Sequence, residues 1–376
     1  MVRDIVADTV SHEEAGGEFH GDVVLIAEAG GDEVAEDSFP VVQQQQQQTS
    51  QQPWRRPRQP TATTRWYASS ARSSGVYKSG RLERPLVAPP VGPGHDAATG
   101  VHSRDVHLGD YSARLYLPPP AAAAAAAERL PVVVYVHGGG FVAESAASPS
   151  YHLFLNRLAA ACPALCVSVD YRLAPEHPLP AGYDDCLAAL RWVLSAADPW
   201  VAARGDLDRV FLAGDSAGGN ICHHLAMHHH HDAPPRRRLR GAVLIHPWFW
   251  GSEAVGEEAP DPEGRARGAG LWVYACPGTT GMDDPRMNPM APGAPPLGRM
   301  ACDRVMVCAA EGDFLRWRAH AYAAAVAAAK GGAAVEVLET AGAGHVFHLF
   351  DPDGDKAKEL LDRMVTFVNG AGADAA

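Results

Sequence analysis

From about residue 106 onward, short apolar runs alternate with longer amphipathic segments, and this alternation limits the possible folds more than any other feature. Several strand-like runs are continuously apolar, as expected of parallel strands buried on both faces. A strand followed by a helix, repeated along the chain, predicts an α/β fold, a mostly parallel central sheet with helices on both faces. The expected strands are Ala113–Leu117, Val132–His137, Ala164–Tyr171, Val210–Ala213, Ala242–His246, Val305–Ala309 and Val335–Glu339; the expected helices are Tyr151–Ala161, Tyr183–Ala196, Ala217–Met227, Leu315–Lys330 and Asp355–Val368.

Two regions do not follow this alternation. The stretch from Gly251 to Arg299 is rich in Gly and Pro, and we expect it to form an insertion or cap near the binding site. Residues 1–75 are first acidic and then rich in Gln, Arg and Ser, with a polyglutamine run at Gln43–Gln48. Such sequence buries too little apolar surface to offset its ordering entropy. We therefore expect residues 1–75 to be largely disordered and residues 76–376 to form the catalytic domain.

Charge and cysteine usage exclude several classes of protein. The formal net charge is −12, and residues 1–40 hold −10 of it, with eleven acids against the single base Arg3. The remainder is close to neutral and offers no basic stripe for nucleic acid. No apolar run reaches the roughly 18 residues of a membrane span, and the start Met1-Val2-Arg3-Asp4 opens no signal peptide. The seven cysteines form no C-x-x-C pair, which predicts reduced thiols in a cytoplasmic protein.

A candidate nucleophile lies where an expected strand meets an expected helix. Gly214-Asp215-Ser216-Ala217-Gly218 has the pattern G-x-S-x-G in the strand–turn–helix context of a nucleophile elbow. Glycines flank the serine because the sharp turn leaves no room for a Cβ. The helix N-terminus favours developing negative charge beside Ser216. The alternative is a Gly-rich turn without a catalytic role.

A second motif precedes it along the chain. The expected strand that begins at Val132 leads into His137-Gly138-Gly139-Gly140. A strand ending in three glycines leaves backbone N–H groups free to stabilise the oxyanion of acyl transfer. We expect the donors to be the N–H groups of Gly138, Gly139 and Ala217. The alternative is a flexible loop that only lets the chain turn.

Such a nucleophile needs a carboxylate and a histidine later in the chain, in that order. Asp313 and His345 both follow strand-like runs, and open α/β sheets place their sites at the carboxyl ends of strands. The competing candidates are Glu311, which is closer to its strand, and His348, which is expected on the following helical turn. We favour Asp313 and His345.

The histidines around His223–His231 favour a different interpretation. His224 and His228 have the i, i+4 spacing of a metal pair, but no carboxylate or cysteine pattern accompanies them. A solvated, low-complexity helix end explains them better. We therefore expect neither a metal nor a cofactor.

With these residues in place, the chain resembles plant carboxylesterases of the hormone-sensitive-lipase-like branch of the α/β-hydrolases. The resemblance extends from about Val76 to Gly370. It rests on the motifs VYKSGRLERP (76–85), TGVHSRDV (99–106), ARLYLP (113–118), HGGGF (137–141), YRLAPEHPLPAGYDD (171–185), GDSAGGN (214–220), DDPRMNP (283–289), CAAEGDFLRWR (308–318) and GHVFHLF (344–350).

This resemblance implies the α/β-hydrolase fold, with a cap built from the N-terminal segment and an insertion around 250–299. It implies a catalytic triad of Ser216, Asp313 and His345, and an oxyanion motif at His137–Gly140. It also implies a small-molecule ester as substrate, without cofactor or metal. No pattern in the sequence predicts an oligomeric state.

The same resemblance supplies alternatives. Gibberellin receptors resemble these esterases with the triad histidine replaced, whereas His345 is present here. Dehydratases of the isoflavonoid pathway resemble them with threonine at the nucleophile, whereas Ser216 is a serine. Lactone-forming acyltransferases keep the whole triad and stay open. A non-enzymatic interaction protein, using the acidic and Gln-rich N-terminus, is the remaining class.

Overall fold

The computed structural model describes residues 63–68, 71–77, 82–83, 88–119, 129–229, 239–258 and 262–370. Its central sheet has eight strands, in the spatial order β11-β10-β9-β8-β6-β7-β5-β4. The pairs β4–β5 and β5–β7 are antiparallel, and all other neighbouring pairs are parallel. These strands are β4 (His102–His107), β5 (Ser112–Leu117), β6 (Leu130–Val136), β7 (Leu165–Asp170), β8 (Gly205–Asp215), β9 (Leu239–Ile245), β10 (Cys302–Ala310) and β11 (Val335–Thr340).

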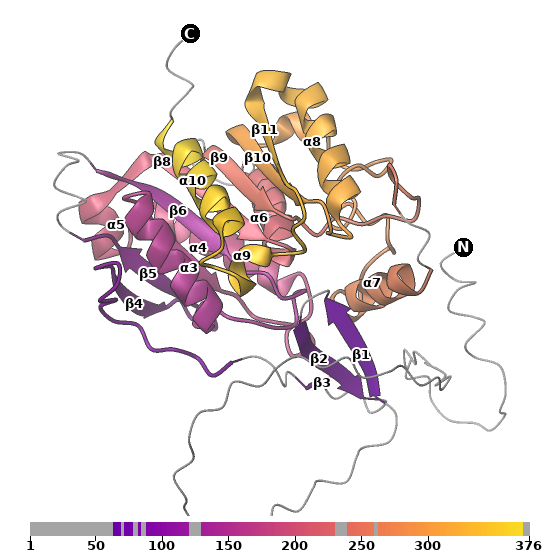
Figure 1. Cartoon of the computed structure of the whole chain (residues 1–376), viewed down its shortest axis with the longest axis horizontal. Helices are drawn as coiled ribbons and strands as arrows, with labels where there is room; N and C mark the ends of the chain where they lie inside the picture. The colour runs from indigo at the N-terminus through magenta and orange to yellow at the C-terminus, as the bar shows by residue number, and fades with distance from the viewer. Residues whose placement is uncertain are drawn as a thin grey trace, which may run out of the picture.

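Helices cover both faces of this sheet (Figure 1). Helices α3 (Pro149–Ala161) and α10 (Asp355–Asn369) pack on one face. Helices α4 (Ala181–Leu194), α6 (Ala217–His228) and α8 (Arg316–Lys330) pack on the other. The remaining helices are α7 (Pro262–Ala275) and the shorter α5 (Pro199–Arg204), α9 (Phe347–Phe350), η2 (Leu297–Arg299) and η3 (Gly332–Ala334).

Strand β6 shows why the strand-like runs are continuously apolar. Val132, Val134 and Val136 belong to the core under α4, α6 and α8. Val133 and Tyr135 belong to the core under α3 and α10. Because successive side chains point to opposite faces of a sheet, a strand covered on both sides needs apolar residues at every position.

The structure confirms the expected α/β fold and contains every strand and helix predicted from the apolar pattern. It adds β4, an edge strand in which exposed and more buried residues alternate, so that its sequence lacks a continuous apolar run. It also adds α7, a helix of 14 residues inside the Gly- and Pro-rich stretch after Gly251. Sequence composition alone masked that helix.

An antiparallel sheet of β1 (Thr63–Ala68), β2 (Ala71–Tyr77) and β3 (Leu82–Glu83) precedes the main domain, with β1 beside α7 (Figure 1). The expectation of disorder therefore fails for residues 63–68 and 71–75. The Thr, Trp and Tyr residues of β1 are types that strands favour, and their low-complexity surroundings hid this signal. Residues 1–62 lie outside the described residues, and the domain boundary at residue 75 stays a prediction.

All seven cysteines are buried and free of disulfides, as the sequence predicts. Among the described helices, none has both the length and the apolar character needed to cross a bilayer.

Candidate active site

Ser216 occupies a sharp turn between the end of β8 and the start of α6. Its φ of +52° lies in a region that non-glycine residues rarely adopt. The turn is closely packed, because a Cβ added to Gly218 would lie 2.0 Å from the carbonyl oxygen of Val136. Only glycine fits at this position, so the first turn of α6 can approach the end of β6. The local geometry is that of a nucleophile elbow.

The structure brings Ser216, His345 and Asp313 into one hydrogen-bonded chain. His345 Nε2 lies 3.0 Å from Ser216 Oγ. His345 Nδ1 lies 2.8 Å from Asp313 Oδ2. Asp313 Oδ1 accepts the backbone N–H of Leu315 at 3.0 Å, which fixes the carboxylate. All three side chains are buried.

Neither Glu311 nor His348 takes part in this series of hydrogen bonds. The exposed carboxylate of Glu311 accepts the backbone N–H of Gly342 at 2.7 Å, which ties together the loops that carry Asp313 and His345. His348 lies on α9, as expected, and is buried, with neither ring nitrogen hydrogen-bonded. Among the described residues, the arrangement therefore favours Asp313 and His345 over these alternatives.

The electrostatics of the pair suit proton transfer. Burial alone would lower the pKa of the His345 imidazole, but the adjacent Asp313 carboxylate outweighs it and raises that pKa above its ordinary value. Burial alone would raise the pKa of Asp313. The charge and hydrogen bond of His345 outweigh burial and lower that pKa. Asp313 is therefore ionised at neutral pH and stabilises a charged His345.

The HGGG segment forms a tight loop after β6. Gly139 and Gly140 have φ of +97° and +64°. A Cβ on Gly139 would lie 2.2 Å from the carbonyl oxygen of Ala143, so this turn requires glycine. The ring of His137 is buried and stacks on Tyr171, with ring centroids 4.4 Å apart. Packing on Tyr171 therefore helps to fix His137 at the start of this loop.

The expectation that Gly138 donates into the site is wrong. Its N–H donates to Tyr151 Oη at 2.9 Å. Tyr151 Oη in turn donates to Asp215 Oδ2 at 2.8 Å, and Tyr135 Oη donates to Asp215 Oδ1 at 2.8 Å. Within the described part of the chain, the N–H groups of Gly139, Gly140 and Ala217 have no protein acceptor. In the described structure, the Gly140 N–H is therefore free of a protein partner where the Gly138 N–H is not.

Sequence reasoning also missed His246, which follows β9. Its φ is +47° and it is 1% exposed. Its Nδ1 accepts the backbone N–H of Val346 at 2.9 Å. Burial lowers the pKa of His246 to about 4, so the ring is neutral at physiological pH. The only sequence signal was its place at the end of an apolar run.

One ring nitrogen of His246, one of His345 and one oxygen of Asp313 lie within 4.8 Å of one another. These donor types could hold a metal ion. However, His246 Nδ1 and both ring nitrogens of His345 already make hydrogen bonds to protein groups. Binding a metal there would disrupt the chain that leads to Ser216, so these residues fit a hydrogen-bonded site better.

The histidines at the end of α6 do not add a second centre. His224 stacks on His228, with ring centroids 3.9 Å apart, and its ring is tilted against that of Tyr183, with centroids 4.2 Å apart. Nδ1 of His223 lies 2.9 Å from Tyr322 Oη. Among the described residues 88–119, 129–229, 239–258 and 262–370, no third ligand joins His224 and His228.

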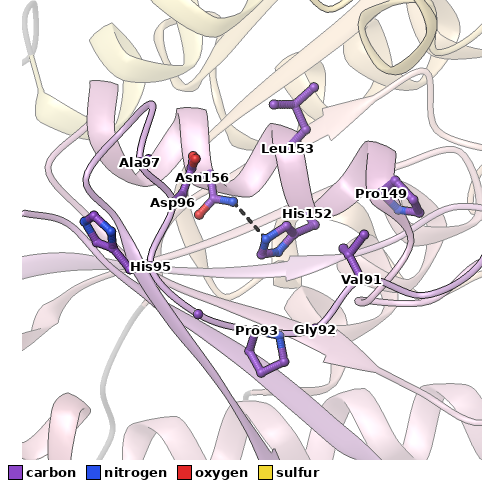
Figure 2. A pocket seen from close by; sticks show the side chains of 11 residues that line it. Val91, Gly92, Pro93, His95, Asp96, Ala97, Pro149, His152, Leu153 and Asn156 are labelled. Carbon is purple, nitrogen blue, oxygen red and sulfur yellow. Dashed lines mark hydrogen bonds between the residues drawn. The ribbon is translucent and has the colours of Figure 1, made fainter.

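A separate pocket of about 360 Å³ lies between the loop after residue 90 and α3 (Figure 2). One of its two histidines, His152, is hydrogen-bonded to Asn156, Tyr116 and Arg114 at 3.2 to 3.3 Å. Burial lowers the pKa of His152. None of the lining residues carries a hydroxyl, thiol or amine nucleophile, so this pocket does not compete with Ser216. They are Val91, Gly92, Pro93, Gly94, His95, Asp96, Ala97, Pro149, His152, Leu153 and Asn156.

Comparisons with known proteins agree with this fold. A family model described as alpha/beta hydrolase fold matches residues 133–349. Tuliposide A-converting enzyme 2 of Tulipa gesneriana, a chloroplastic protein, is 43% identical over 303 residues, which cover 78% of this chain and 76% of that protein. Probable carboxylesterase 2 of Arabidopsis thaliana is 39% identical over 297 residues, which cover 78% of this chain and 93% of that protein.

Solved esterase structures show the same fold. A thermostable carboxylesterase cloned from a metagenomic library superposes with a TM-score of 0.61 at 29% identity, covering 72% of this chain and 88% of that chain. An esterase of Pyrobaculum calidifontis gives a TM-score of 0.57 at 28% identity, covering 75% of this chain and 87% of that chain. The α/β-hydrolase fold implied by the motifs is therefore confirmed.

The expectation of a cytoplasmic protein is wrong. The similar tulip enzymes are chloroplastic or amyloplastic, which points to a plastid. Cysteine usage reports the redox state of a compartment and does not distinguish one reducing compartment from another.

The electrostatics give a prediction that needs no substrate. We expect His345 to titrate above the ordinary histidine pKa of about 6.5, and His246 at a pKa of about 4. Asp313→Asn should lower the pKa of His345, because it removes the negative charge that stabilises the imidazolium. Proton NMR of the imidazole resonances measures both values. An unchanged His345 pKa in Asp313→Asn would contradict the assigned cause of the shift.

Proposed function

Because the chain belongs to the plant carboxylesterases of the hormone-sensitive-lipase-like branch of the α/β-hydrolase family, we propose that it cleaves small carboxylic esters through an acyl-enzyme on Ser216. One observation carries this proposal: Ser216, His345 and Asp313 are linked at 3.0 and 2.8 Å. A nucleophile, a base and an orienting carboxylate in this order are what acyl transfer requires.

In the proposed mechanism, Ser216 Oγ attacks the ester carbonyl carbon while His345 Nε2 takes the serine proton. The Asp313 carboxylate stabilises the resulting imidazolium and keeps its Nδ1–H aligned. His345 then gives the proton to the leaving alcohol, and the acyl group stays on Ser216. His345 then takes a proton from a water molecule that attacks the acyl carbonyl carbon. The bond from that carbon to Ser216 Oγ breaks, His345 returns the proton to Ser216 Oγ, and the carboxylic acid leaves. These steps use neither a cofactor nor a metal.

The oxyanion formed in each half-reaction needs donors. We propose the backbone N–H groups of Gly139, Gly140 and Ala217, which lack protein acceptors in the described structure. Ala217 is the first residue of α6, so the partial positive charge of the helix N-terminus adds to its N–H. Donors fixed in advance cost no reorganisation when charge develops.

A second candidate is transfer of the acyl group to an internal hydroxyl, which forms a lactone. It uses the same acyl-enzyme and differs only in whether water or a hydroxyl of the acyl group attacks. The similarity to tuliposide A-converting enzymes favours keeping it. The receptor alternative is disfavoured because His345 stands within hydrogen-bonding distance of Ser216, and the dehydratase alternative because Ser216 is a serine.

If the three residues act as a unit, Ser216→Ala and His345→Ala should each remove nearly all turnover of p-nitrophenyl acetate. The double variant should then be little worse than either single variant. Asp313→Asn should lower kcat by about 10²- to 10⁴-fold, because the imidazole loses its orienting carboxylate.

Glu311→Gln is the matched control for Asp313→Asn, since it changes a neighbouring carboxylate that contacts Gly342 instead of His345. It should keep kcat within about threefold, because an exposed loop contact contributes little. A larger loss in Glu311→Gln than in Asp313→Asn, with both proteins folded, would show that the carboxylate is misassigned.

The two candidate reactions differ in their products. With an ester whose acyl group carries a γ-hydroxyl, hydrolysis gives the hydroxy acid and internal transfer gives the lactone. We expect the hydroxy acid as the main first product, and mass spectrometry of early time points measures the ratio. A lactone that appears before any acid would show that the reaction is internal acyl transfer and not hydrolysis.

Tyr151 and Tyr135 give a matched pair for the oxyanion loop, since both donate to Asp215 but only Tyr151 accepts from Gly138. Tyr151→Phe and Tyr135→Phe should each cost about 1–3 kcal/mol of stability. Only Tyr151→Phe should also lower kcat per folded enzyme, by about tenfold or more, because the loop carrying two oxyanion donors loses its anchor. Equal kcat values in the two variants would show that Tyr151 does not position the oxyanion loop.

A further inference from the structure

His246 connects strand β10, which leads to Asp313, with the residue that follows His345. Its backbone N–H donates to the carbonyl oxygen of Cys308 at 2.9 Å, near the end of the strand that leads to Asp313. Its ring Nδ1 accepts the N–H of Val346 at 2.9 Å, directly after His345. One residue thus contacts both the strand before Asp313 and the residue after His345, and in the described structure it makes no hydrogen bond to Ser216.

The residue that His246 holds is in a strained conformation. Val346 has φ of +45°, and for a β-branched residue this is a genuine outlier. Rotation about φ of Val346 reorients the peptide that joins it to His345. A hydrogen bond to the N–H of that peptide opposes such a rotation. Strain of this kind persists only where the surroundings determine the conformation.

The ring of His246 is suited to accept that bond at all working pH values. Accepting at Nδ1 places its single proton on Nε2. A protonated ring would carry a hydrogen on Nδ1 and could not accept. The groups that face it are Asp313, His345, Phe347 and His348. Burial lowers the pKa of His246 to about 4, so it stays neutral despite the nearby carboxylate.

We propose that His246 is a positioning residue, whose Nδ1 fixes the Val346 N–H and thereby aims the His345 imidazole between Ser216 and Asp313. This inference rests on the proposed ester hydrolysis for its kinetic consequences, but its geometric claim does not. A displacement of about 1 Å in a reacting group can cost about a hundredfold in rate. A hydrogen bond to Val346, the residue next to the base His345, can therefore change kcat by changing where that base is held.

The test compares three single variants. His246→Leu removes the acceptor and keeps apolar volume. His246→Asn restores an oxygen close to the position of Nδ1 and tolerates a positive φ. His348→Leu is the matched control, because His348 is equally buried in the same cluster but makes no hydrogen bond to Val346. Each protein is titrated to completion with a fluorophosphonate, so that kcat refers to folded active sites.

We expect His246→Leu to lower kcat per titrated site by about tenfold to a hundredfold, with KM within about twofold. His246→Asn should recover most of that loss, and His348→Leu should match the wild type. The acidic limb of kcat/KM should move to lower pH in His246→Leu, because His345 loses alignment with the carboxylate that raises its pKa. If His246→Leu does not fold, His246→Ala takes its place with the same expectations.

Wild-type kcat with an unmoved acidic limb in His246→Leu would overturn the inference. An equal loss in His246→Asn, or in His348→Leu, would do the same, since it would reduce the effect to core packing. The pKa of His345 measured by NMR keeps the test valid in the absence of turnover. A wild-type protein that cleaves no ester would contradict the proposed function, whereas an unchanged His345 pKa in His246→Leu would contradict only the positioning role.

Discussion

The close approach of α6 to the end of β6 is the constraint on which the site depends. A Cβ at position 218 would lie 2.0 Å from the Val136 carbonyl oxygen, so the approach exists only because that residue is glycine. It forces the turn that holds Ser216 at a φ of +52°. It also places the first N–H of α6 beside the loop that follows β6. The proposed nucleophile and the proposed oxyanion donors therefore come together as one consequence of backbone packing.

Hydrogen bonds between buried polar groups then stabilise this packing. Asp215 lies between Tyr135 and Tyr151 at 2.8 Å from each, and Tyr151 receives the N–H of Gly138. Burial raises the pKa of Asp215, although the two phenol hydrogen bonds oppose that effect. Asp215, the residue before Ser216, is thus linked through Tyr151 to the HGGG loop. His246 likewise ties the strand that leads to Asp313 to the residue after His345.

Much of this could be predicted from the sequence, because the decisive signals are local. The apolar runs identified the strands of the main sheet apart from β4, and motif context selected Ser216, Asp313 and His345 as the residues that the fold brings together. Gly138 was misassigned because the partner of its N–H, Tyr151, is determined by tertiary packing. His246 was missed for the same reason, since its role depends on a backbone N–H 100 residues away. Helix α7 was not predicted because its stretch of sequence is rich in Gly and Pro. The compartment was predicted wrongly because the same cysteine usage occurs in every reducing compartment.

In the proposed mechanism Ser216 carries the acyl group during turnover, and this covalent intermediate can be trapped. The protein would be mixed with p-nitrophenyl acetate, quenched in acid within the first turnovers, digested, and analysed by mass spectrometry. Our account predicts an acetyl group on the peptide that contains Ser216, formed with a burst of p-nitrophenol and absent in Ser216→Ala. Continued ester turnover with an unmodified Ser216, or an acetyl group on another residue that turns over at the same rate, would contradict it.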